Sequence, residues 1–126
     1  PQKKHAKRRL KFFVDTTRFL KRTNYSIAAS SEGVHHHFHG IAPFNKGIYR
    51  MALEANIPIV PLYINVPEAN NMNASKYANN GTIGIEILDE ISTKDWTLEN
   101  LDKHIDDVRK VFVKRFNQLN PDNKTQ

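Results

Sequence analysis

The stretch from residue 32 to residue 64 decides the fold, and it reads EGVHHHFHGIAPFNKGIYRMALEANIPIVPLYI. It opens with a Glu-Gly pair, passes through a histidine-rich loop and reaches a Phe-Asn-Lys-Gly lead at residues 44–47. The following apolar residues recur at helical spacing up to Asn56, which can end a helix in the left-handed conformation, and Pro58 prevents continuation. Residues 57–64 are mostly apolar, β-branched or aromatic, so they predict a strand. The order loop, helix, strand is typical of a right-handed crossover between parallel strands.

Segments on both sides of this stretch extend the pattern. Residues 4–22 show the apolar spacing of a helix, and residues 25–29 form a short apolar run that predicts a buried strand. Residues 82–88 alternate isoleucines with smaller or polar residues, which predicts an edge strand with one solvated face. Residues 98–119 carry a long series of apolar residues three or four apart, which predicts the final helix.

These segments predict one α/β domain over residues 1–126, with a mostly parallel sheet flanked by helices. Residues 26–29 and 59–64 are expected to be parallel neighbours joined by the helix between them. The final helix is expected to be capped by Thr97 and to pack its apolar stripe on the sheet. We expect the stripe to start at Leu98.

The composition is that of a globular domain, with 39% apolar and 25% charged residues. The chain has no cysteine, which excludes disulfides, cysteine-based metal sites and cysteine nucleophiles. No apolar run approaches the ~20 residues that a membrane-spanning helix needs.

Positive charge is concentrated at the N-terminus. Residues 1–22 hold nine basic side chains against one acidic, and the rest of the chain holds ten against twelve. Such a segment is either a solvated helix face or a contact for an anionic partner. Among such partners we expect an anionic membrane surface or an acyl-carrier phosphate, and no nucleic acid, because Phe12, Phe13 and Phe19 are predicted to lie in the core.

Three blocks of the chain resemble the lysophosphatidate (glycerolipid) acyltransferase family. The family's Phe-Pro-Glu-Gly-Thr-Arg-Ser block corresponds to Ser-Ser-Glu-Gly-Val-His-His at residues 30–36. Its Phe-Lys-Lys-Gly-Ala block corresponds to Phe-Asn-Lys-Gly-Ile at residues 44–48. Its Leu-Glu-Ala-Gly-Val-Pro-Ile-Val-Pro-Val phrase is closely matched by Leu-Glu-Ala-Asn-Ile-Pro-Ile-Val-Pro-Leu at residues 53–62. The resemblance spans most of residues 4–118.

This resemblance implies an acyltransferase of phospholipid biosynthesis. The expected reaction moves an acyl chain from acyl-CoA or acyl carrier protein to the hydroxyl of a lysophosphatidate-like acceptor, without a metal or organic cofactor. The expected location is the cytoplasmic side of a membrane, as a peripheral protein. The family's general base is the histidine of a His-x4-Asp motif, and no histidine here has an aspartate at that spacing. The chain therefore corresponds to the downstream part of the domain, and we expect no catalytic residue in it and no activity from it alone.

The resemblance places substrate-binding residues at Glu32, Gly33, His35 and Lys46. His35 stands where the family's arginine holds the acceptor phosphate, and an imidazole serves that purpose when it is protonated. Lys46 is the second cation, and Glu32 is expected to hold the loop by accepting hydrogen bonds. The alternative for His35 is a solvated loop histidine.

Two further hypotheses compete with this function. In an extended segment His35, His37 and His39 would point the same way and could hold Zn²⁺, although three histidines without a nearby carboxylate favour adventitious binding, so no native metal site is predicted. The chain could also be a non-enzymatic module that binds anionic lipid or nucleic acid through its basic N-terminal helix. A His-x4-Asp motif upstream in a longer reading frame would favour the enzyme.

Overall fold

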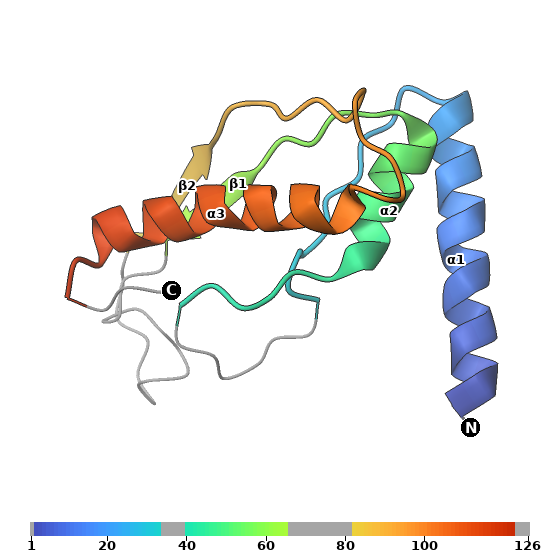
Figure 1. The fold of residues 1–126 in the computed structure, drawn as a ribbon, viewed down its shortest axis with the longest axis horizontal. Helices are drawn as coiled ribbons and strands as arrows, with labels where there is room; N and C mark the ends of the chain where they lie inside the picture. The colour runs from blue at the N-terminus through green and yellow to red at the C-terminus, as the bar shows by residue number, and fades with distance from the viewer. Residues whose placement is uncertain (1, 34–39, 66–81, 123–126) are drawn as a thin grey trace. The chain divides into compact units, whose positions relative to one another are not determined.

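The computed structural model describes residues 2–33, 40–65 and 82–122 (Figure 1). Its elements follow the order α1 (Gln2–Arg22), α2 (Lys46–Ala55), β1 (Leu62–Asn65), β2 (Gly84–Ile87) and α3 (Leu101–Leu119). The chain divides into two compact units. The helical unit contains α1, α2 and α3, and the strand unit, Ile59–Ile91, contains β1 and β2. No helix in the described ranges is long and apolar enough to cross a bilayer.

In the helical unit, α1 packs against α2 along a seam of small and apolar side chains. Leu20 of α1 is buried together with Met51 and Ala55 of α2, and Phe13 packs against this cluster. A Cβ atom on Gly47 would lie 2.5 Å from Cζ of Phe13. Glycine at this position therefore lets the two helices approach closely, which explains a helix-weakening residue in the first turn of α2.

Gly47→Ala is expected to destabilise the chain by about 1 kcal/mol, even though alanine is favoured over glycine in a helix by about the same amount. The added methyl group meets the Phe13 ring, and overpacking of this kind typically costs ~1–3 kcal/mol. Denaturant unfolding measures the difference. In a Phe13→Leu background the same substitution should be neutral or stabilising, and stabilisation in the wild-type background would contradict the predicted contact.

The inward face of α3 begins at Leu101. Leu101 and Val108 are buried, whereas Leu98, expected to share their stripe, is 57% exposed. The reason is a turn before the helix, in which the Thr97 N–H donates to Asn100 Oδ1 (2.7 Å) and the Asn100 N–H donates to Thr97 Oγ1 (3.2 Å). Thr97 therefore closes this turn and does not cap α3, so the helix begins one turn later than predicted.

The strand unit is an antiparallel pair. Leu62 lies opposite Ile87, and the register continues along both strands. An isolated bridge extends the pairing, in which the N–H groups of Ile59 and Ile91 each donate to the other's carbonyl, at 2.9 and 2.7 Å.

A mostly parallel sheet was predicted, and the described residues do not contain one. Their two-stranded sheet consists of β1 and β2, which run antiparallel. The predicted strand at residues 26–29 is exposed and forms no ladder. Apolar composition alone does not make a strand, since its N–H and C=O groups need a neighbouring strand to pair with. The alternation along residues 83–87 was predicted correctly. The solvated face is the apolar one, because Ile83, Ile85 and Ile87 are exposed.

Candidate functional site

The Glu-Gly pair lies in a turn that is tied to the N-terminus of α2. The Gly33 N–H donates to the Ser30 carbonyl (3.2 Å), and Gly33 has a φ of +74°, a conformation that favours glycine. Asn45, the residue before α2, donates its N–H to the Ser31 carbonyl (2.8 Å) and its side-chain Nδ2 to the Glu32 carbonyl (2.8 Å). The two family-like blocks on either side of the histidine-rich loop therefore meet at one end of α2.

The Glu32 carboxylate holds the chain where it leaves that loop. Its Oε1 accepts a hydrogen bond from the Ala42 N–H (2.9 Å). From α3, Arg109 donates through Nη2 to the Ile41 carbonyl (2.7 Å) and through Nε to the Ala42 carbonyl (3.2 Å). Glu32 and Arg109 thus hold the backbone of residues 41–42 from two sides, an arrangement that we call the 41–42 clamp. Acceptance of a backbone hydrogen bond by Glu32 agrees with the loop-holding role expected for it.

Lys46 is the first residue of α2 and directly follows Asn45, whose side chain is hydrogen-bonded to this turn. Its Nζ forms an ion pair with the Asp102 carboxylate of α3 at 2.7 Å, and both side chains are exposed. The first turn of α2 contains no acidic residue, and the N-terminal end of a helix favours negative charge. Exposed ion pairs contribute only ~0–1 kcal/mol, so a phosphate group could compete with Asp102 for Lys46.

Tyr49 supports the same turn from inside the helical unit. Its hydroxyl shares a hydrogen bond with the Ser31 hydroxyl at 2.7 Å. Burial raises the pKa of Tyr49, and the hydrogen bond with Ser31 opposes this shift in part. The ring stacks on Phe44 with centroids 6.1 Å apart and lies 6.5 Å from Trp96. Tyr49 is therefore a neutral, buried support of this turn at neutral pH.

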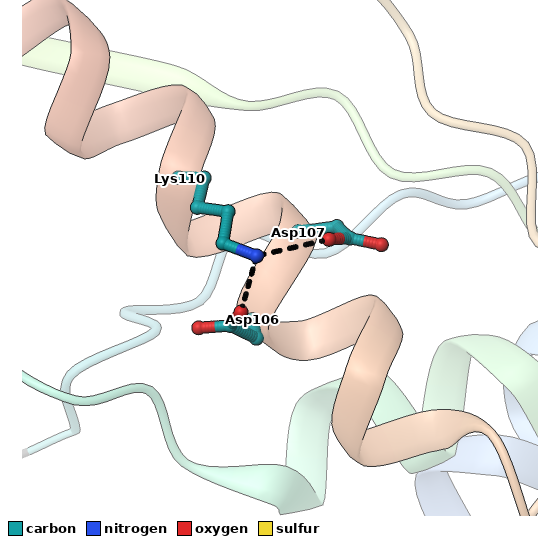
Figure 2. Close-up of polar contacts among 3 residues, drawn as sticks. All are labelled: Asp106, Asp107 and Lys110. Atoms are coloured by element: carbon teal, nitrogen blue, oxygen red, sulfur yellow. Dashed lines mark hydrogen bonds and ion pairs between the residues drawn. The ribbon is translucent and has the colours of Figure 1, made fainter.

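Two other cations of α2 and α3, Lys110 and Arg50, form ion pairs with carboxylates of their own helices. Figure 2 shows Lys110 reaching Asp106 (2.6 Å) and Asp107 (3.5 Å) within α3. The hydrogen bond that Lys110 donates to Asp106, together with the negative charges of Asp106 and Asp107, raises the pKa of Lys110. Arg50 likewise pairs with Glu54 along α2 at 2.8 Å. These local pairs make Lys46, whose partner lies on another helix, the stronger candidate for an external anion.

Of the predicted site residues, Glu32, Gly33 and Lys46 are brought together at the start of α2, and their contact with substrate stays a prediction. His35 lies outside the described residues, as do the other histidines of the zinc hypothesis. In the described ranges, no group of three or more His, Asp or Glu side chains could hold a metal ion. Sequence reasoning missed Arg109 and Asp102. Both are charged residues on a helix face, and nothing in their local sequence indicates contact with a segment some sixty residues earlier.

The helical unit thus contains a Glu-Gly turn, the 41–42 clamp and a lysine at the N-terminus of α2. Together they define a candidate anion-binding site of a mixed α/β protein. Several curated proteins that match the chain are named 1-acyl-sn-glycerol-3-phosphate acyltransferases, which confirms the resemblance to this family and is consistent with a partial domain. A Caenorhabditis elegans protein named for this activity, acl-2, is 28% identical over 101 residues, 79% of this chain and 36% of its own length.

Plant and bacterial relatives match similarly. The enzyme of Limnanthes douglasii is 25% identical over 100 residues, 79% of this chain and 36% of its own length. That of Haemophilus influenzae is 30% identical over 84 residues, 67% of this chain and 34% of its own length. The chain therefore spans about a third of the length of these relatives. No protein-family model matches the chain, and no solved structure matches it significantly.

Proposed function

We propose that this chain forms the acceptor-binding part of a glycerolipid acyltransferase. In this proposal, the complete enzyme moves an acyl chain from acyl-CoA or acyl carrier protein to the hydroxyl of lysophosphatidate. The family-like blocks at residues 32–33 and 44–47 hold the phosphate of the acceptor. The general base comes from a His-x4-Asp motif outside this chain.

The observation that carries the proposal is the joining of these two blocks, which a ten-residue gap separates in sequence. Asn45 ties the start of α2 to the carbonyls of Ser31 and Glu32, and the relatives that share the region are named as acyltransferases of this acceptor class. A phosphate bound here would meet Lys46 and the N-terminal end of α2, both of which favour negative charge. The phosphate would anchor the acceptor and leave its hydroxyl to react elsewhere.

The chemistry also indicates what this chain lacks. Attack on a thioester carbonyl requires removal of the acceptor's hydroxyl proton, and a positioned base contributes typically about 10²–10⁴-fold to such a step. Glu32 uses a carboxylate oxygen for the Ala42 N–H, and Tyr49 is a neutral phenol. A longer polypeptide that contains this chain and an upstream His-x4-Asp should acylate lysophosphatidate, whereas this chain alone should not. An inactive longer polypeptide would favour the binding-module alternative.

If His35 holds the phosphate in place of the family's arginine, glycerol 3-phosphate is expected to bind this chain more weakly as the pH rises from about 6 to about 8, because an imidazolium loses its charge over that range. His35→Arg should remove the pH dependence and keep binding at the higher pH, since a guanidinium stays charged. Lys46→Ala should weaken binding at both values, and Asp102→Asn should strengthen it by releasing Lys46. Calorimetric titration at both pH values measures binding by the wild type and by the three variants, with His5→Gln on α1 as the control.

A flat pH response combined with no effect of Lys46→Ala would remove the acceptor phosphate from this part of the chain. It would leave His35 as a solvated loop residue.

A further inference from the structure

The segment that leads into α2 has no regular structure of its own, so contacts with other parts of the helical unit set its position. Residues 41–45 form no helix or strand and continue directly into α2 (Figure 1). Backbone groups in such a segment still need hydrogen-bond partners where they are removed from water. Here the partners come from the Glu-Gly turn and from α3.

Arg109 fixes the backbone of this segment, because one guanidinium serves two consecutive carbonyls. Its Nη2 donates to the carbonyl of Ile41 at 2.7 Å, and its Nε donates to that of Ala42 at 3.2 Å. These two nitrogens lie on the same edge of the planar guanidinium, so the fork fixes the direction of both carbonyls as well as their distance. A lysine ammonium has no such fork.

Two more side chains of α3 reach the same stretch of chain. The ring of Phe112 meets the ring of Phe44 edge-on, with centroids 5.4 Å apart and an interplanar angle of 79°. Asp102 forms its ion pair with Lys46, the first residue of α2. Asp102 lies seven residues before Arg109, and Phe112 lies three residues after it. At this spacing the three side chains lie along one side of α3.

The same segment connects the two parts of the candidate anion-binding site. Asn45 donates its N–H to the Ser31 carbonyl and its side-chain Nδ2 to the Glu32 carbonyl, both at 2.8 Å. Only Pro43 and Phe44 separate the 41–42 clamp from Asn45, and proline holds its own φ at about −65°. A displacement at the clamp is therefore transmitted to Asn45 and to the N-terminal end of α2.

We propose that Arg109 is a positioning residue of the acceptor site. It acts through the backbone of residues 41–42, by keeping the N-terminal end of α2 against the Glu-Gly turn. A site whose parts are already in place binds more tightly, because less ordering accompanies binding. This inference rests on the proposed function and adds to it a residue of α3 that lies outside all three family-like blocks.

The first test needs no ligand. Amide hydrogen exchange, followed by NMR, reports on the Asn45 N–H, whose partner is the Ser31 carbonyl and which Arg109 does not contact. Arg109→Ala should speed this exchange about tenfold relative to that of Met51, inside α2. The control is Val108→Ala, which removes a neighbouring side chain that is 2% exposed and should lower overall stability without raising that ratio. An unchanged ratio in Arg109→Ala would overturn the proposal.

Phe112 gives an independent check, with a matched control on α1. Phe112→Leu removes the ring that contacts Phe44, so it should also speed exchange at Asn45. Phe12 and Phe19 were predicted to lie in the core from their helical spacing, but they are 61% and 47% exposed, so that prediction was wrong. Phe12→Leu therefore removes the same ring from an exposed site and should leave Asn45 unchanged. Equal effects of the two substitutions would mean that α3 does not hold this segment.

The second test is calorimetric titration with glycerol 3-phosphate, on variants that circular dichroism shows to be folded. Arg109→Ala should weaken binding about tenfold, which lies within the range of energetic coupling between linked sites. Arg109→Lys should fall between this variant and the wild type, because an ammonium group lacks the fork. Val108→Ala should keep the wild-type affinity. A role in stability alone predicts a similar loss at both positions, so a loss confined to position 109 identifies positioning.

The two tests separate this inference from the proposed function. If the wild type does not bind glycerol 3-phosphate, or if Lys46→Ala binds it as tightly, the proposed function fails. Exchange at Asn45 then still decides whether Arg109 holds the start of α2. If the wild type binds through Lys46 but Arg109→Ala keeps the same affinity, the acceptor site stands and the positioning role of Arg109 is wrong.

Discussion

Leu101→Ala is expected to destabilise the chain by about 2–5 kcal/mol, the range measured for buried leucines. Leu101 is fully buried at the start of α3, with 0% of its surface exposed. Removal of its side chain loses the transfer free energy of the deleted atoms and leaves a cavity that the surrounding helices fill only in part. Denaturant unfolding at equilibrium gives the difference.

Leu98→Ala is the matched control, three positions earlier in the same apolar series. Leu98 is 57% exposed and precedes the helix, so its substitution should change stability by no more than about 0.5 kcal/mol. Periodicity alone predicts similar losses at both positions, whereas the structure predicts a loss at one. Comparable destabilisation by the two substitutions would show that α3 begins earlier and that Leu98 belongs to its buried stripe.

Features set by neighbouring residues were predicted well. The sequence predicts all three helices, and Asn56 ends α2 in the left-handed conformation, with a φ of 52°, as its side chain and the following Ile-Pro suggest. Each of these features depends on spacing or on backbone preference within a few residues, which is the information that one sequence carries.

Features set by distant partners were not predicted. The expected strand at residues 26–29 depends on a neighbouring strand to complete its hydrogen bonds, and spacing cannot provide one. Phe12 and Phe13 are adjacent and chemically identical, yet one is exposed and the other packs against the α1–α2 core. Helical spacing is compatible with a broad apolar sector, and only the position of α2 decides which part of it is buried.

The candidate site shows the same division. The Glu-Gly and Phe-Asn-Lys-Gly blocks were recognised from sequence, but the hydrogen bonds that join them through Asn45 were not. The clamp was missed because Arg109 acts on carbonyls 67 and 68 residues earlier. A backbone acceptor leaves no trace in the identity of the residue that carries it, so no local pattern could have revealed the pairing.

Arg109→Ala is expected to destabilise the chain by about 2–3 kcal/mol, since hydrogen bonds that involve a charged group contribute ~1.5–3 kcal/mol each and this guanidinium is partly solvated. It removes both donors to the carbonyls of Ile41 and Ala42. Arg109→Lys keeps the charge but replaces the fork by a single ammonium group, so it should recover less than half of the loss. Lys114→Ala, an exposed site on the same helix, should stay within about 0.5 kcal/mol of the wild type.

The opposite side of the clamp gives a second, independent measurement. Glu32→Gln keeps an oxygen that can accept from the Ala42 N–H, whereas Glu32→Ala leaves that donor without its side-chain acceptor and should cost about 1–3 kcal/mol. If the two residues hold residues 41–42 as one unit, the losses from Glu32→Ala and Arg109→Ala will not add, with a coupling of at least about 0.5 kcal/mol in a double-mutant cycle. Strict additivity would mean that each side holds its own backbone group independently. Loss of glycerol 3-phosphate binding in both single variants, with less effect in Glu32→Gln, would connect the clamp to the binding of the acceptor phosphate.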